Sequence, residues 1–239
     1  MTFHGNIHIL ELIEGAKKAK GLTVIIDVFR AFSVESYLAA MGAESIRPAG
    51  SIEEAKQLAL SYPGCITIGE RLGRQLPGFD FGNSPSQIRD SKDRIPGKTI
   101  IHTTSAGTQG IVNATGADEI ILGSLTMAKA ISQYILARNP REVSLVCMGD
   151  NGTRPNEEDE LCARYIRSLL LGEAFDIKTA IDHLKTHGGK KFFDPALQDV
   201  YPEPDYAMCV NYDAFDFVLK AESDEAGYLV KILHAPFEG

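Results

Sequence analysis

The sequence predicts an α/β fold of three layers, in which helices cover both faces of a mixed, largely parallel sheet. Short runs of β-branched and other apolar residues alternate with segments whose apolar residues recur at helical spacing, and small-residue loops separate the two. With 239 residues and a hydrophobic fraction of 44%, the chain is long enough to bury a substantial core. We therefore expect one α/β domain over residues 1–239, built from repeated β-loop-α units.

The first unit alternates two strands with two helices. The β-branched run at its start is typical of a buried strand, a glycine past a last turn ends its first helix, and Ser51 with Glu54 forms a capping box for its second. In order, the predicted elements are a strand at Thr23–Asp27, a helix at Ser33–Met41, a strand at Glu44–Pro48 and a helix that begins after Ser51.

A similar order of elements returns about 75 residues later. It comprises a strand at Lys98–Thr103, a loop at Thr104–Gly110 that runs into a helix at Thr108–Ala114, a strand at Ala117–Leu122 and a helix opened by Gly123 and Ser124. Glycine precedes the second strand of each unit, and Gly-Ser follows it. We interpret this as two pseudo-repeated halves, at about 21–96 and 97–171, followed by a C-terminal extension at 172–239.

A third unit and the C-terminal extension complete the prediction. The third unit has a strand at Glu142–Met148, a loop at Gly149–Pro155 and a helix at Asn156–Leu171. The extension has a helix at Thr179–Thr186, a proline-rich turn at Tyr201–Pro204, a helix through Tyr212–Leu219 and a final strand at Tyr228–His234.

Composition excludes several classes of partner. The formal net charge of −8 makes nucleic acid or an anionic membrane surface a poor partner. No apolar run reaches the ~18–20 residues that span a bilayer, and the first ten residues lack the pattern of a secretory signal. The four cysteines are too scattered for a disulfide framework. These features favour a cytoplasmic location.

Four loops are candidates for carrying chemistry, because ligands of such sheets bind beyond the carboxyl ends of the strands. Three of them follow predicted strands, and the fourth is a long segment that reads as neither strand nor helix. They are Asp27–Ser33, His102–Thr108, Gly149–Arg154 and Gly69–Pro85.

Each candidate also has an ordinary structural interpretation. Asp27 and Arg30 fit a metal-binding or nucleophilic carboxylate beside a phosphate clamp, or else a helix-entry acid and a surface arginine. The hydroxyls and glycine of Thr103–Thr108 fit an anion site or plain helix capping. The acids Glu157–Asp159 after Asn156 fit a Mg²⁺ site or a helix start.

Two further segments also have two interpretations, and the known sequence signatures of nucleotide and phosphate sites are absent or incomplete. Glu70-Arg71 fits a functional pair or a surface ion pair, and Asn83-Ser84 a ligand-binding turn or a simple helix start. The standard nucleotide loops are absent. Cys65 and Arg71 have the spacing of a cysteine-phosphatase loop, but the β-branched residues between them read as a strand.

Four blocks of this sequence together resemble the 2-phosphosulfolactate phosphatase family. They are the first strand and loop Val24–Ala31, the long loop Gly69-Glu70-Arg71 with Gly78–Pro85, the threonine-glycine loop Thr103–Thr108, and the acidic helix start Glu158–Ala163. The likeness covers about Val24 to Leu170 well and the C-terminal part loosely. It implies a magnesium-dependent phosphatase of coenzyme M biosynthesis that converts 2-phosphosulfolactate to sulfolactate and phosphate.

The resemblance leads to a hypothesis for the site. Mg²⁺ is expected among the carboxylates of Asp27, Glu70, Glu158 and Asp159. Arg30 and Arg71 are expected to clamp phosphoryl oxygens, so that Asp27, Arg30, Glu70 and Arg71 form the catalytic set. The remaining anionic group of the substrate is assigned to Asn83, Ser84, Thr103, Thr104, Gly107 and Thr108.

Departures from the family pattern keep alternatives open. Ala106 and Gln109 stand where the family usually has asparagine and arginine, and Phe32 where a small threonine is usual. A phosphatase for another phosphorylated 2-hydroxy acid, a catalytically degenerate protein that binds small anions, and a purely structural module are the alternatives. The small anionic phosphomonoester is the expected partner, and a homodimer stays open.

Overall fold

Strands β1 to β10 form one mixed sheet, in a computed structural model that describes residues 2–237. The strands are β1 (Asn6–Glu11), β2 (Gly21–Ile26), β3 (Ser45–Pro48), β4 (Ile66–Arg71), β5 (Arg74–Gln75), β6 (Thr99–Thr103), β7 (Ala117–Gly123), β8 (Glu142–Cys147), β9 (Phe217–Asp224) and β10 (Gly227–His234). Their order across the sheet is β1-β8-β2-β7-β9-β10-β3-β6-β4-β5.

The α-helices lie between these strands along the chain. They are α1 (Leu12–Lys18), α2 (Ala31–Ala40), α3 (Ile52–Ser61), α4 (Pro85–Asp90), α5 (Gly107–Asn113), α6 (Ala128–Arg138), α7 (Glu157–Leu171), α8 (Ile177–Thr186) and α9 (Glu203–Cys209). None of the helices among the described residues is long and apolar enough to cross a bilayer.

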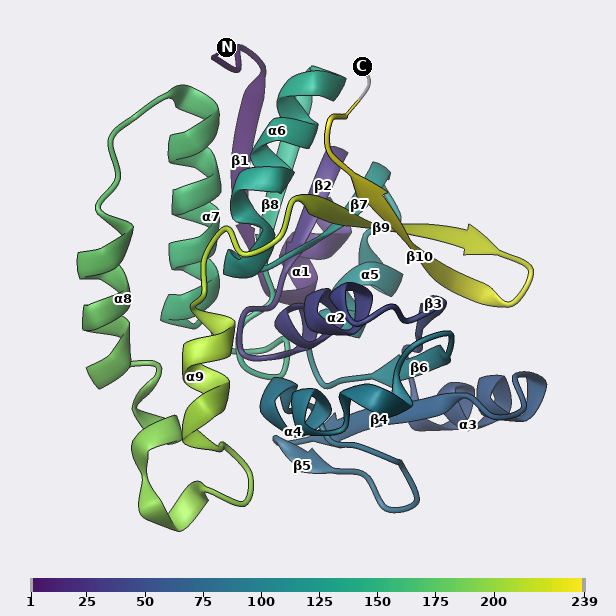
Figure 1. Cartoon of the computed structure of the whole chain (residues 1–239). Helices are drawn as coiled ribbons and strands as arrows, with labels where there is room; N and C mark the ends of the chain where they lie inside the picture. The colour runs from purple at the N-terminus through teal and green to yellow at the C-terminus, as the bar shows by residue number, and fades with distance from the viewer. Residues whose placement is uncertain (1, 238–239) are drawn as a thin grey trace.

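Two groups of parallel strands lie in the sheet, and the hairpin β9–β10 joins them. β1, β8, β2 and β7 form one group, and β3, β6 and β4 form the other. The hairpin pairs antiparallel with β7 on one side and with β3 on the other, where Val230 faces Ile46. In Figure 1, β1, β2 and β8 stand upright whereas β4 runs across the view. The sheet therefore turns at the hairpin, and loops from both groups can reach one place.

The strand order has an internal symmetry. If β2, β3 and β4 exchange places with β6, β7 and β8, the order β8-β2-β7 to β3-β6-β4 is reversed onto itself. The strands that begin the two predicted halves, β2 and β6, thus lie at equivalent positions. Asp27 follows one of them, and Thr104 follows the other. The division into halves remains a prediction.

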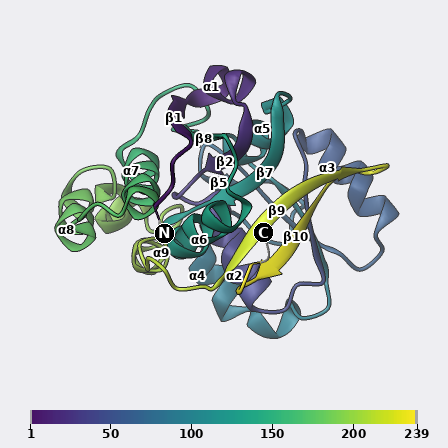
Figure 2. The same cartoon turned by 90° about the horizontal axis from the view of Figure 1, so that it is seen from above.

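Helices cover both faces of the sheet, as the three-layer prediction requires. α1 and α5 pack together against β8 and β2, while α6 and α7 pack together on the other side, α7 over β8 and β2 and α6 over β7 and β9 (Figure 2). Val24, Ile25 and Ile26 of β2 lie between the layers and are fully buried, which explains their unbroken apolar run. The predicted fold class is confirmed.

Local sequence signals account for most of the element boundaries. Ser51 accepts a hydrogen bond from the Glu54 backbone N–H at the start of α3, as the capping box predicts. Asn156 caps α7 through the Asp159 N–H, and Gly172 ends α7 with a φ of 68°. The predicted third-unit helix is therefore confirmed almost residue for residue.

Two predicted elements of the C-terminal extension are wrong or incomplete. The helix predicted at Tyr212–Leu219 is instead a turn that leads into strand β9. Phe217, Val218 and Leu219 are buried because β9 lies inside the sheet between β7 and β10, and a continuous apolar run of this kind also fits a helix. The turn at Tyr201–Pro204 leads directly into α9, which accepts proline in its first turn.

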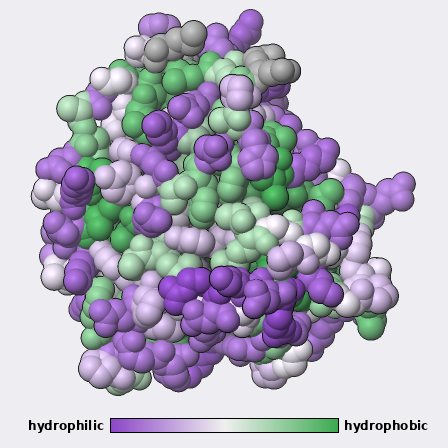
Figure 3. Space-filling model, in the orientation of Figure 1, coloured by the Kyte–Doolittle hydropathy of each residue, from purple (hydrophilic) through white to green (hydrophobic). Residues whose placement is uncertain are grey.

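The long segment expected to lack regular structure is partly a strand. Gly69, Glu70 and Arg71 end β4, which turns back into the two-residue strand β5. At the turn, Leu72 is left-handed with a φ of 55°, and its side chain is 74% exposed. In Figure 3, which has the orientation of Figure 1, the surface at the bottom of the molecule, where β5 and α4 lie, is mainly hydrophilic.

Candidate active site

A cavity of about 360 Å³ lies where β2, β4, β6 and β8 end. Each of the four predicted loops contributes to it, together with two residues of the C-terminal extension. Its lining residues are Asp27, Phe29, Arg30, Glu70, Leu72, Gly73, Asn83, Ser105, Ala106, Gly149, Asp150, Asn151, Arg154, Lys191 and Tyr201. We call this space the central cavity. Its size suits a small organic ligand.

Asp27 lies in the wall of the central cavity, directly after β2. Its side chain is 7% exposed, and Oδ1 accepts a hydrogen bond of 3.1 Å from the Ala31 N–H at the start of α2. Burial, with a smaller contribution from the charge of Glu70, raises the pKa of Asp27 to about 7. A carboxyl group with this pKa is poised to ionise near neutral pH, which is common for groups that take part in chemistry.

Gly107 is placed against the carboxylate of Asp27. A Cβ at this position would lie 2.9 Å from Asp27 Oδ2 and 2.9 Å from the Ala31 Cβ. The backbone of α5 therefore approaches the acid more closely than any side chain would permit. This contact explains why the predicted site needs glycine here, whatever the ligand.

Glu70 joins two loops of the central cavity. Its carboxylate is 6% exposed and accepts one backbone hydrogen bond of 2.7 Å at each oxygen, from Ser105 and from Gly73. A carboxylate oxygen has two lone pairs, so one site on each oxygen stays available for a further ligand. Glu70 and Asp27 thus present carboxylate oxygens to the same space.

Asp159 lies behind the central cavity rather than in its lining. Its two oxygens accept hydrogen bonds of 2.8 Å from the backbone N–H groups of Val28 and Gly149. It therefore ties the loop after β2 to the loop after β8. Burial, followed by the charge of Asp27, raises the pKa of Asp159. The geometry assigns Asp159 to the support of the cavity.

Glu158 faces the C-terminal extension. It is 1% exposed, neither oxygen has a hydrogen-bond partner among the described residues, and the ammonium of Lys191 lies 3.7 Å away. Burial raises the pKa of Glu158. Glu158 lines a separate pocket with Asp150 and His187, so the structure does not bring all four predicted metal ligands to one point.

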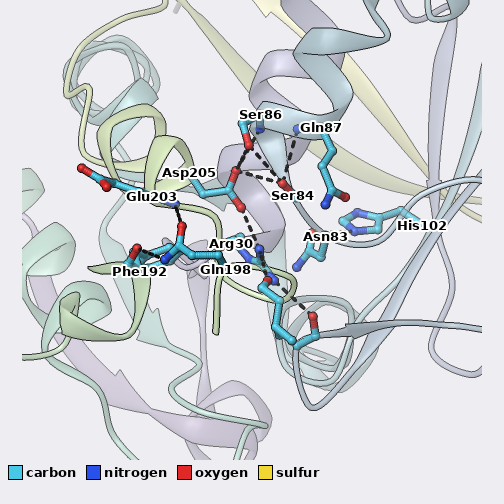
Figure 4. Close-up of polar contacts among 12 residues, drawn as sticks. Arg30, Asn83, Ser84, Ser86, Gln87, His102, Phe192, Gln198, Glu203 and Asp205 are labelled. Atoms are coloured by element: carbon cyan, nitrogen blue, oxygen red, sulfur yellow. Dashed lines mark hydrogen bonds and ion pairs between the residues drawn. The ribbon is translucent and has the colours of Figure 1, made fainter. Parts of the chain in front are cut away.

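Arg30 reaches the central cavity, but other protein groups engage its guanidinium. One nitrogen donates to Asp205 Oδ2 at 2.7 Å and to the Val200 carbonyl at 2.9 Å, and the other donates to the Gly73 carbonyl at 3.3 Å. Figure 4 shows this arrangement, with Asp205 also accepting from Ser84 and Ser86. Arg30 therefore holds the C-terminal extension onto the cavity, a role that the sequence did not reveal.

The predicted anion-binding residues are divided between capping and a second pocket. Thr104 and Thr108 bond each other's backbone at the start of α5, and Thr103 accepts from Arg71 at 3.2 Å. Ser84 caps α4. Of this set and Arg71, only Asn83 lines the central cavity, while Gly107 contacts Asp27.

The second pocket, which we call the adjoining pocket, has a volume of about 500 Å³ and shares Leu72, Ser105 and Asn151 with the central cavity. Arg71 and Gln109 line it. The Gln109 side-chain amide donates to the Gly50 carbonyl, so this departure from the family pattern supplies a link to the neighbouring loop in place of a cation.

Lys191 is a cavity residue that the sequence did not reveal. It belongs to a 3₁₀ turn at Lys190–Phe193 and lies 5.5 Å from the Phe29 ring and 5.4 Å from the Tyr201 ring. With Arg154 it adds two cations to the lining besides Arg30; each lies 3.7 Å from a carboxylate, Lys191 from Glu158 and Arg154 from Asp150, whereas Arg30 donates to Asp205 at 2.7 Å. The Lys190-Lys191 pair in the C-terminal extension was the only local signal.

The donors of the central cavity suit a Mg²⁺ ion that keeps several waters. Among residues 2–237, no three His, Cys, Asp or Glu side chains are grouped to hold a metal. Mg²⁺ in phosphoryl-transfer sites commonly takes one or two carboxylates, with waters and phosphate oxygens completing the shell. Asp27 and Glu70 fit this pattern, since a divalent cation offsets the burial, and the smaller repulsion by Glu70, that raise the pKa of Asp27.

Comparison with known proteins gives the family. The model of the family described as 2-phosphosulpholactate phosphatase matches residues 7–224. Proteins named probable 2-phosphosulfolactate phosphatase are 28% identical in Bacillus subtilis, with 85% of this chain and 88% of the relative covered, and 31% identical in Caldanaerobacter subterraneus, with 84% and 87% covered. A third, from Carboxydothermus hydrogenoformans, is 39% identical, with 69% and 67% covered. The chain belongs to the 2-phosphosulfolactate phosphatase family, a family of phosphoric monoester hydrolases.

Proposed function

We propose that this protein hydrolyses 2-phosphosulfolactate to sulfolactate and phosphate in the central cavity, with Mg²⁺. The observation that carries the proposal is the pair of buried carboxylates, Asp27 and Glu70, that faces the same small cavity as Lys191 and Arg154. Oxygen ligands beside cationic donors are what a phosphate ester bound to a metal requires. The names of the relatives supply the substrate.

In this proposal Asp27 and Glu70 hold Mg²⁺, which neutralises charge on the phosphoryl oxygens when bound. Lys191 and Arg154, which line the same cavity, bind the anionic oxygens of the substrate, and the rings of Tyr201 and Phe29 lie beside Lys191. Asp159 keeps the loops that carry Asp27 and Gly149 in place. Positioning and electrostatic stabilisation then supply most of the acceleration.

The adjoining pocket offers space for the end of the substrate that does not react. Arg71 is the cation in its lining, whereas Gln109 is neutral and bonded to Gly50. This weaker positive charge favours a second candidate, a phosphatase for another phosphorylated 2-hydroxy acid. The cytoplasmic location and the homodimer stay predictions.

A phosphate-release assay tests the proposal. We expect 2-phosphosulfolactate to be hydrolysed faster than phospholactate or phosphoglycerate, and we expect EDTA to abolish turnover until excess Mg²⁺ is added. Preference for phospholactate or phosphoglycerate would support the second candidate. Full activity in EDTA would reject the metal, and no phosphate release from any of these esters would reject the function.

Lys191→Met tests the proposed binding of the substrate by the cationic lining residues. The substitution keeps most of the apolar stem that covers Phe29 and Tyr201 but removes the charge. We expect KM to rise about tenfold to a hundredfold, since a charge-assisted hydrogen bond to the substrate is lost. Lys185→Met is the matched control, because Lys185 is exposed and lies over Phe193, outside the cavity lining. Equal kinetic constants for both variants would contradict the assignment.

A further inference from the structure

A fully buried pair of titratable side chains lies behind the central cavity and has no part in the proposal above. Glu35 of α2 and His102 of β6 are both 0% exposed, and Glu35 Oε1 lies 2.8 Å from His102 Nδ1. The second carboxylate oxygen, Oε2, has no partner among the described residues. Removing ionisable groups from water costs free energy, so we expect the contacts of this pair to serve a role that offsets the cost.

The pair contacts a residue that lines the central cavity. His102 Nε2 lies 3.2 Å from Asn83 Oδ1, and Asn83 is 5% exposed in the lining of the central cavity. In Figure 4 the Asn83 amide lies against the His102 ring, with its nitrogen turned away from the ring. His102 itself is fixed, because β6 pairs it with Pro48 of β3 and Ile68 of β4.

The direction of these hydrogen bonds determines which end of Asn83 faces the cavity. An amide oxygen only accepts, so His102 Nε2 carries a hydrogen and donates it. At Nδ1, either an imidazolium donates to ionised Glu35, or protonated Glu35 donates to a neutral ring. One proton is shared in both forms, the pair is neutral overall, and Nε2 keeps its hydrogen. The NH₂ group of Asn83 is therefore left for the cavity.

We propose that Glu35 and His102 are positioning residues, which hold the Asn83 amide so that its NH₂ group donates to an anionic oxygen of the ligand in the central cavity. The inference rests on the proposed function in that the ligand is a phosphate ester or the phosphate product. Without the pair, the amide is free to turn its oxygen into the cavity, where it would repel an anion.

The test compares two neutral replacements of the pair. Glu35→Leu/His102→Leu removes both charges together, so no lone charge stays buried. Glu35→Gln/His102→Gln keeps a relay, because the amide at 35 donates to the oxygen at 102 and the amide at 102 donates to Asn83. Both are also made in the Asn83→Ala background. The readouts are kcat and KM for phosphate release, and the Kd for inorganic phosphate by calorimetry in Mg²⁺.

We expect the Leu pair to lower kcat/KM about tenfold to a hundredfold and to weaken phosphate binding about tenfold, as loss of one hydrogen bond to a charged group implies. The Gln pair should stay within about threefold of the parent protein. In the Asn83→Ala background the Leu pair should cause no further loss.

Three results would overturn the inference. They are equal loss with the Leu and Gln pairs, the same fold-loss with and without Asn83, and unchanged kinetics and phosphate affinity in the Leu pair. A parent protein that binds phosphate but hydrolyses no ester would reject the proposed function, and the phosphate affinities of the variants would still decide the inference. A parent protein that neither binds phosphate nor releases it would reject both.

Discussion

Asp27→Asn should abolish phosphate release and leave the fold intact. Asparagine is isosteric with aspartate and keeps an oxygen that accepts from the Ala31 N–H, so the start of α2 is preserved. The asparagine side chain cannot ionise, so it does not supply the negative charge that, in the proposed function, holds Mg²⁺ together with Glu70. We expect kcat to fall about a hundredfold to a thousandfold or more, measured as phosphate release in saturating Mg²⁺.

The matched control is Asp118→Asn, because Asp118 is exposed on β7 and does not line the central cavity. It should turn over at the parent rate. Turnover by Asp27→Asn within a few-fold of the parent would remove Asp27 from the site and leave Glu70 as the only buried carboxylate of the cavity.

The same variant has an opposite effect on stability at high pH. Burial raises the pKa of Asp27 to about 7 in the folded, metal-free protein, above the ordinary 3.8 of an aspartate in the unfolded chain. Protonation therefore stabilises the fold fully below 3.8, and this contribution is lost as the pH rises through about 7. In EDTA at pH 8, Asp27→Asn should unfold at a temperature at or above that of the parent protein. At pH 5 the two should agree more closely. A clear loss of stability at pH 8 would contradict the raised pKa.

The strands that are buried on both faces could be predicted, because they appear in the sequence as short unbroken runs of apolar residues. β2 and β6 are β-branched runs of strand length between small-residue loops. The first three residues of β9 are buried in the same way, yet they adjoin the aromatic-rich turn before them, and the pattern also fits a helix. Its hairpin with β10 and its antiparallel pairing with β7, about 100 residues earlier in the sequence, determine the strand. Periodicity carries no information about such pairing.

The site was predictable to the extent that strand ends specify it. Asp27 follows from position alone, since it ends a predicted strand, whereas Glu70 lies in the segment predicted to be neither strand nor helix and was assigned through the resemblance to the family. Lys191 and Asp205 could not be found in this way, because Lys191 lines the cavity, and Asp205 binds Arg30, from a C-terminal extension whose packing has no local signature. Asp205 lies 175 residues from its partner Arg30. Paired charges at this separation look like ordinary surface residues in a sequence.

The second large effect is expected at Arg30. Arg30→Ala leaves the Asp205 carboxylate, which is 0% exposed, without its cation. Ser84 and Ser86 still donate to Asp205, so the loss should lie at the lower end for broken buried pairs, about 3 kcal/mol in the free energy of unfolding. For a chain of this length that is roughly 6–12 °C in Tm, measured by thermal unfolding.

Arg30→Lys separates charge from shape. Lysine keeps the cation for Asp205, but a single ammonium cannot also reach the carbonyls of Val200 and Gly73, which come from two different loops. We expect Arg30→Ala and Arg30→Lys to lose activity to nearly the same extent, while the loss of stability is smaller in Arg30→Lys, about 2 kcal/mol. Arg74→Ala is the control: its pair with Asp199 is exposed on both sides and should contribute about 0–1 kcal/mol. Near-parent turnover in Arg30→Lys would mean that the positive charge alone is enough. The several hydrogen bonds of the guanidinium would then not be what holds the C-terminal extension onto the cavity.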